Sequence, residues 1–361
     1  MNTDVYDRLA KVLDTLPNGF PATETGVEIR ILKKIFSPEQ AELFCNLRLS
    51  FETAEEISRR TGRPSEDLEA RLMDMVKGGQ LFMIRLGKTR YFRMMPWVFG
   101  IYEFQLGRFD RELAELCEEY SPTYSKQFFS QKPQLMQTLP IEQTIPLHQE
   151  ALSYEKVSSI INGGQSFLVN ECICKKEQGL LDHPCDRPIH VCLAVAPVPE
   201  VFDRSPIGKV ITKEEANELI VKSEEAGLVH LTGNVQAGQF YICNCCKCCC
   251  GVLKAINKYN IPAPMVINSH YYAQIDPEKC IACGICADER CQVNAIEEGD
   301  EVYRIVKGRC IGCGLCAQTC PAEAISLVHK TQEQRETPPV TEDDWYKERA
   351  RTRGVDYSVF K

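Results

Sequence analysis

The chain has 361 residues, of which 44% are hydrophobic and 25% are charged, and its formal net charge is −8. This composition is typical of a globular protein with two or three domains and excludes a disordered or fibrous chain. The negative charge argues against a general affinity for nucleic acid.

No segment predicts export or membrane insertion. Residues 1–16 are polar and charged and lack the apolar core of a signal peptide. No stretch approaches the roughly 18 apolar residues that a membrane span needs. We therefore expect a cytoplasmic protein, in which the 20 cysteines meet a reducing environment and bind metal more readily than they pair.

Residues 1–95 predict a winged-helix-like domain. Helices are expected over 29–35, 38–47 and 53–60, and the helix counted as the third of the motif opens at Pro64 and runs to Lys77. Thr53 with Glu56 forms a capping box at the start of the short helix 53–60. Two strands, 81–86 and 90–94, follow as a hairpin. The order of three helices and a hairpin is that of a winged helix.

Charge decides how this domain is interpreted. A DNA-binding winged helix presents its third helix to the major groove and grips phosphates with basic groups. Here the third helix carries Glu66, Asp67, Glu69 and Asp74, although the hairpin has Arg85, Lys88, Arg90 and Arg93. DNA binding is therefore the disfavoured alternative. The preferred interpretation of residues 1–95 is a protein-docking or structural module.

A helical segment and linker is expected over 96–149, where proline becomes frequent. Alternating helices and strands over 150–270 indicate a mixed α/β middle domain. No glycine-rich nucleotide fingerprint or P-loop occurs in the chain, so no nucleotide cofactor is implied.

The middle domain carries ten cysteines in two groups. The first group is Cys172, Cys174, Cys185 and Cys192, and the second is Cys243, Cys245, Cys246, Cys248, Cys249 and Cys250. Thiolates at this density select iron–sulfur clusters, zinc or copper(I). We expect one or two further iron–sulfur clusters here, with a zinc site as the alternative. The simplest partition gives each group its own centre, but the groups can also interleave across facing strands.

One cysteine spacing occurs twice near the end of the chain. Cys280, Cys283 and Cys286 precede Cys291, and the same triplet returns as Cys310, Cys313 and Cys316 before Cys320 and Pro321. Thiolates at i, i+3 and i+6 wrap a tight loop around one iron–sulfur cube, and Gly284 and Gly314 relieve crowding in these loops. Zinc knuckles use separated pairs instead of triplets.

This duplicated unit resembles the bacterial two-cluster ferredoxin, over residues 274–330. The resemblance implies two 4Fe-4S clusters, in which the fourth cysteine of each run binds the cluster of the other run. One cluster would then be held by Cys280, Cys283, Cys286 and Cys320, and the other by Cys310, Cys313, Cys316 and Cys291. The first run departs from the pattern, because four residues separate Cys286 from Cys291 and Gln292 replaces the usual proline.

The expected architecture is α+β and multidomain: winged helix (1–95), helical linker (96–149), cysteine-rich α/β domain (150–270), two-cluster ferredoxin domain (271–330) and charged tail (331–361). In this layout the chain is similar to multidomain iron–sulfur proteins of anaerobic bacteria. The expected function is electron transfer between redox partner proteins. A redox-sensing transcription regulator and the iron–sulfur subunit of a reductase are the alternatives; no catalytic residues are predicted, and a stand-alone enzyme is disfavoured.

Overall fold

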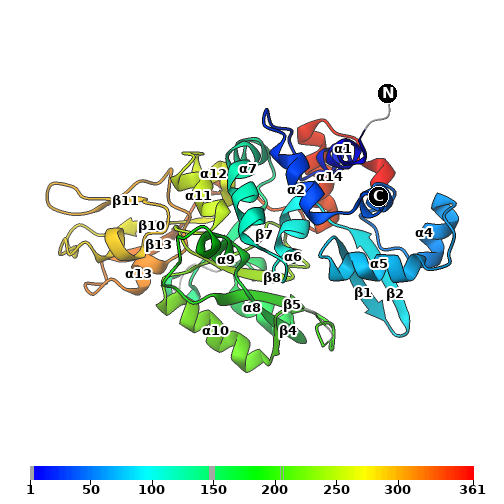
Figure 1. Ribbon diagram of the computed structural model, residues 1–361. Helices are drawn as coiled ribbons and strands as arrows, with labels where there is room; N and C mark the ends of the chain where they lie inside the picture. Colours follow the sequence, from blue (N-terminus) through cyan, green and yellow to red (C-terminus); the bar gives the residue numbers. More distant parts are fainter. Residues whose placement is uncertain (1–3, 146–150, 204, 206) are drawn as a thin grey trace. The chain divides into compact units, whose positions relative to one another are not determined.

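The computed structural model describes residues 4–145, 151–203, 205 and 207–361 (Figure 1). The chain divides into two compact units. The first comprises Met1–Phe128, Leu180–His183 and Tyr346–Lys361, and the second comprises Phe129–Gly179 and Pro184–Trp345. Residues 146–149 of the expected linker lie outside the described residues. Among the helices in the described ranges, none has both the length and the apolar character to span a bilayer.

The first unit is mainly helical and contains one β-hairpin. Its helices are α1 (Val5–Thr15), α2 (Val27–Ile35), α3 (Pro38–Phe44), α4 (Ala54–Thr61), α5 (Leu68–Lys77), α6 (Tyr102–Phe104), most of α7 (Arg111–Phe129) and most of α14 (Glu342–Arg353). The hairpin pairs β1 (Leu81–Leu86) with β2 (Thr89–Met94).

Local sequence explains several of these helix ends. The Thr53 hydroxyl accepts a hydrogen bond from Glu56 N at 3.2 Å, and the Glu56 carboxylate accepts one from Thr53 N at 2.7 Å. This capping box starts α4. Helix α5 begins at Leu68, later than the proline at position 64 suggested, because Asp67 has a left-handed φ of 60°. The winged-helix assignment of this unit stays a prediction.

Residues Tyr346–Lys361, which fall in the charged tail expected over 331–361, belong to the first unit. The Arg353 guanidinium donates to the carbonyl and to the carboxylate of Asp14, both at 2.9 Å. Arg349 is 1% exposed and lies over the ring of Phe128, 4.4 Å from its centroid. Because these long side chains are buried against their own chain, α14 is an integral part of the unit.

A seven-stranded sheet forms the centre of the second unit. Its order is β6 (Lys209–Ile211), β4 (Ser166–Glu171), β5 (His190–Ala196), β8 (Tyr241–Cys245), β7 (Val229–Gly233), β3 (Met136–Leu139) and β9 (Ile267–Asn268). Neighbouring strands are antiparallel except β3 and β9, which are parallel.

The two faces of this sheet differ in chemistry. Helices α8 (Val157–Gly163) and α10 (Lys213–Glu225) cover one face (Figure 1), where Leu193, Ile242 and other apolar side chains form a buried core. Side chains alternate between the faces of a strand. Cys192 on β5 and both Cys243 and Cys245 on β8 therefore point to the opposite face. The two-residue alternation of side chains along β5 and β8 therefore places the apolar core and the cysteines on opposite faces of the sheet.

The ferredoxin segment of the second unit consists of short elements around cysteine loops. Its elements are β10 (Tyr271–Ile275) paired with β13 (Ile325–His329), β11 (Ile296–Glu297) paired with β12 (Arg304–Ile305), and helix α13 (Leu315–Gln318). The helices that precede β10 are α9 (Ile173–Leu180), α11 (Gly251–Asn257) and α12 (Ala263–Val266). Each repeat contributes one strand before and one strand after its cysteine run, and both two-stranded pairs join a strand of the first repeat to a strand of the second.

Candidate metal centres

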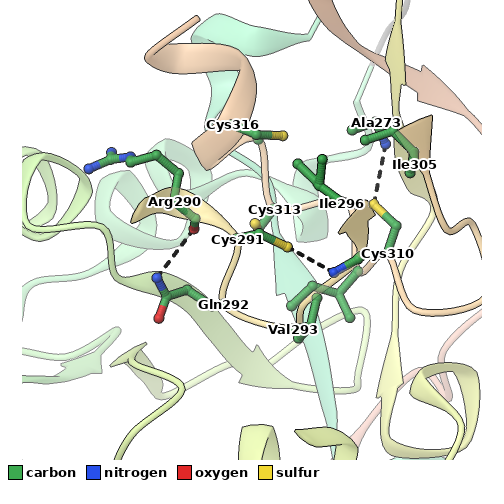
Figure 2. A pocket seen from close by; sticks show the side chains of 13 residues that line it. Ala273, Arg290, Cys291, Gln292, Val293, Ile296, Ile305, Cys310, Cys313 and Cys316 are labelled. Atoms are coloured by element: carbon green, nitrogen blue, oxygen red, sulfur yellow. Dashed lines mark hydrogen bonds between the residues drawn. The ribbon is translucent and has the colours of Figure 1, made fainter. Parts of the chain in front are cut away.

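Four cysteines from both repeats surround the first pocket of the ferredoxin segment. Figure 2 shows Cys291, Cys310, Cys313 and Cys316 around it, with Ile296, Ile305 and Val293 as apolar neighbours. The pocket encloses about 350 Å³ that protein atoms do not fill, part of it open to solvent. The structure thus brings Cys291 of the first run to the triplet of the second.

The second pocket has the reciprocal composition. Cys280, Cys283 and Cys286 line it together with Cys320, and its free volume is also about 350 Å³. Tyr303 lies at its wall. Each repeat therefore supplies three thiols to one pocket and one thiol to the other, as the resemblance implies; that these thiols bind a cluster stays a prediction.

A π turn accommodates the extra residue of the first run. Residues Cys286–Arg290 form this turn (η4), and Cys291 N donates to Cys286 O at 3.0 Å, five residues back. A turn with i→i+5 bonding takes up one more residue than an α-helical turn. In the second run Cys320 N instead donates to Ala317 O, three residues back. Cys291 thereby reaches its pocket despite the longer spacing.

Gln292, which replaces the usual proline, is 1% exposed and joins two cysteine segments. Its side-chain oxygen accepts a hydrogen bond from Lys247 N at 3.0 Å, and its amide nitrogen donates to Arg290 O at 3.2 Å (Figure 2). Lys247 stands between Cys246 and Cys248. A proline could not make these side-chain bonds, so the departure from the family pattern connects the ferredoxin segment to the middle-domain cysteines.

Backbone N–H groups point at sulfur in both pockets. Ala295 N donates to Cys291 Sγ at 3.1 Å, and Ala324 N donates to Cys320 Sγ at 3.3 Å, at equivalent positions of the two repeats. Ala273 N donates to Cys310 Sγ at 3.3 Å (Figure 2). Such hydrogen bonds stabilise negative charge on sulfur and raise the reduction potential of a bound cluster.

Burial opposes ionisation of the thiols. It raises the pKa of Cys286 to about 11 and the pKa of Cys313 to about 12. At neutral pH these groups are protonated unless a metal holds them. Binding of a metal or cluster must therefore displace protons from these sites.

Six of the middle-domain cysteines form a closed ring. Each thiol interacts with two others of the set, in the order Cys172, Cys174, Cys250, Cys245, Cys243, Cys192 and back to Cys172. The strands position them: β5 and β8 are antiparallel with Leu193 opposite Ile242. One step further along this register places Cys192 opposite Cys243 on the face away from the core.

The other four cysteines form a second, tighter group. The sulfur atoms of Cys185, Cys246, Cys248 and Cys249 all lie within 4.8 Å of one another. Cys185 comes from the loop between α9 and β5, and the other three come from the loop between β8 and α11. This grouping differs from the simplest partition expected from the sequence, because Cys185 lies with three cysteines of the second group and not with Cys172, Cys174 and Cys192. The side chains interleave instead.

A cluster of acid and imidazole groups in the second unit has no signal in the sequence. Glu155, His270 and His329 bring one ligand-type atom each within 4.8 Å of the others, and Glu155 contacts His270 Nδ1. His270 Nε2 lies 3.0 Å from the Glu336 carbonyl, and Arg335 lies 3.5 Å from His329 Nε2. The nearby guanidinium disfavours a cation, so this cluster is best described as a partly buried acid–base network. Only the pairing of β10 with β13 brings its histidines together.

Comparison with known proteins concerns the ferredoxin segment. Residues 273–327 match the family of 4Fe-4S dicluster domains. This match supports 4Fe-4S cluster binding by the segment that contains both pockets. Comparisons of the chain with curated proteins and with solved structures give no significant match.

Proposed function

We propose that the chain is an electron-transfer protein that relays low-potential electrons between redox partner proteins in an anaerobic cytoplasm. The observation that carries this proposal is the reciprocal pair of four-thiol pockets within the dicluster segment. Two cubes held in one small domain let an electron pass from one to the other without bond making in the protein. The proposed ligands are the eight cysteines that line these pockets.

The middle domain extends the relay in this proposal. The ring of six thiols is too large for the four ligands of one cube and too small for two separate cubes, so it would bind a single polynuclear metal–sulfur centre. The hydrogen bond between Gln292 and Lys247 supports a route from the Cys291 pocket toward the middle-domain cysteines.

Two features support a docking role for the first unit over DNA binding. Arg90 forms an ion pair with Glu69, and Arg93 lies over the rings of Phe51 and Phe82 at 5.1 and 5.4 Å. Basic groups of the hairpin are thus engaged within the chain. A redox-sensing regulator stays the disfavoured alternative.

The six-thiol ring favours one alternative function. In that alternative the chain is the iron–sulfur subunit of a reductase, and the six-thiol centre would reduce a small molecule. Reduction of a small molecule by the protein with an artificial electron donor would favour that alternative over a carrier.

Anaerobic isolation tests the main proposal. The protein should contain at least about eight iron and eight sulfide ions per chain, the content of two cubes. Dithionite should reduce it to a state whose EPR spectrum shows two interacting 4Fe-4S clusters. A colourless protein without acid-labile sulfide would contradict the proposal.

A further inference from the structure

The tight group of four cysteines differs in size from the other thiol sites. The sulfur–sulfur distances are 3.7 Å for Cys185–Cys246, 3.5 Å for Cys185–Cys248, 3.2 Å for Cys246–Cys248 and 3.5 Å for Cys248–Cys249. Among the described residues, no three of the eight ferredoxin cysteines bring their sulfur atoms within 4.8 Å of one another. The four cysteines are therefore spaced for a smaller occupant.

Elementary geometry identifies the size of that occupant. Zinc–thiolate bonds of about 2.3 Å in a tetrahedron place the sulfur atoms about 3.8 Å apart. The four sulfur–sulfur distances given above, 3.2–3.7 Å, are close to this edge length. A cube places its thiolates on four separate iron atoms, so they stand well apart. A disulfide is excluded for these pairs, since it needs a sulfur–sulfur distance of about 2.0 Å.

We propose that Cys185, Cys246, Cys248 and Cys249 bind one divalent metal ion in tetrahedral thiolate coordination, without inorganic sulfide and separate from the six-thiol ring. Zinc and mononuclear iron share this coordination chemistry. The ion joins the α9–β5 loop to the β8–α11 loop, which are 61 residues apart at Cys185 and Cys246. Each thiol loses its proton on binding.

The surroundings of the site fit an anionic thiolate centre. Lys175 is 4% exposed and interacts electrostatically with both Cys192 of the ring and Cys246 of the tight group. A buried ammonium group needs nearby negative charge, which metal-bound thiolates supply. Apolar Val191 and Leu228 pack against Cys246 and Cys249, while Cys248 is exposed. The site thus lies at the edge of the core and is accessible to a metal ion.

The order of cysteines in 243–250 follows from the two sites. Cys243 and Cys245 point to the ring because side chains alternate along β8. The loop then turns Cys246, Cys248 and Cys249 to the tight group, and Cys250 at the start of α11 returns to the ring. One segment of eight residues therefore serves two centres, which accounts for its six cysteines.

Metal and sulfide counts on the anaerobically isolated full chain test the proposal. Replacing the exposed ligand, Cys248→Ala, should remove one metal ion per chain and no sulfide, while the matched Cys45→Ala variant in the first unit should lose neither. Loss of zinc identifies a zinc site, and loss of one iron together with a mononuclear iron EPR signal identifies an iron site; both support the proposal. Loss of equal amounts of iron and sulfide from Cys248→Ala would overturn it.

A measurement on the unmodified protein covers the case in which the variant does not fold. X-ray absorption at the zinc edge should show four sulfur neighbours at about 2.3 Å and no second metal nearby. If the protein contains no zinc, Mössbauer spectra should show one mononuclear iron beside the clusters. Absence of both signals would refute the mononuclear site. Because these signals require no sulfide, the outcome is independent of the test for the ferredoxin clusters.

Discussion

Cys185 Sγ lies 3.7 Å from Cys246 Sγ, although 61 residues separate them in the chain. The contact joins the loop that precedes β5 to the loop that follows β8. Because β5 and β8 are hydrogen-bonded neighbours in the sheet, their adjacent ends bring these two loops together. Strand pairing thus decides which thiols share a site.

The fourth cysteine of the first run should bind the cluster of the second run. Cys291→Ala should reduce iron and sulfide by up to about four each per chain, the content of one cube, because Cys310, Cys313 and Cys316 lose their fourth ligand. The EPR spectrum of the reduced protein should change from two interacting clusters to one isolated cluster. Cys117→Ala, a buried thiol of the first unit, is the control and should retain both clusters. An unchanged iron content in Cys291→Ala would contradict the ligand assignment.

The Gln292 side chain should stabilise the second unit. In Gln292→Ala the partly buried Lys247 N–H loses its acceptor, which costs about 1 kcal/mol of unfolding free energy. Anaerobic denaturant unfolding measures the effect, with the exposed Gln332→Ala as the control, for which a change within about 0.5 kcal/mol is expected. Equal stability of the two variants would show that the bond contributes nothing.

Gly314 should not tolerate a side chain. It has a φ of 84°, and a Cβ atom built there would overlap the Thr144 hydroxyl. Gly314→Ala should destabilise the fold by at least about 1–2 kcal/mol, the cost of a left-handed L-residue. Gly308→Ala is the matched control, since it has no neighbour within 4 Å and no positive φ. In the double variant Gly314→Ala/Thr144→Ala, the stability lost to the steric overlap should return, whereas the cost of the left-handed backbone should remain. Full recovery of stability would argue against backbone strain.

The Arg353–Asp14 contact should hold α14 against α1. Arg353→Lys keeps the charge but loses the two-pronged donation to the Asp14 carbonyl and carboxylate. Hydrogen bonds of this charged kind contribute about 1.5–3 kcal/mol, so a loss of this order is expected on thermal or denaturant unfolding. The exposed Arg351→Lys on the same helix should change stability far less. Similar losses for both variants would assign the effect to the helix in general.

His329 should make the folded state less stable at acidic pH. Burial, and then the charge of Arg335, lowers its pKa from the ordinary 6.5, so the folded state favours neutral imidazole. The unfolded chain binds the proton more readily. Stability from this group is therefore complete above pH 6.5 and falls as pH decreases toward the lowered pKa. Unfolding free energies of the wild type and of His329→Gln should differ in slope between pH 7.5 and 5; parallel curves would count against this role.

Local patterns allowed much of the ferredoxin segment to be predicted. Thiols at i, i+3 and i+6 lie within one loop, so Cys310, Cys313 and Cys316 reach one pocket by chain geometry alone. The Thr53–Glu56 capping box is likewise a relationship within one turn, and the structure contains it. In both cases a few consecutive residues carry the whole determinant.

The interactions that cross the chain could not be predicted in this way. The sequence by itself determined that the C-terminal cysteines form two matched loops and that the middle domain is rich in metal-binding thiols. Only the tertiary structure decided that Cys185 joins Cys246, that Gln292 accepts from Lys247, and that Glu155 meets His270 and His329. The physical reason is that spacing records neighbours along a loop, whereas strand order and register decide which distant loops lie together.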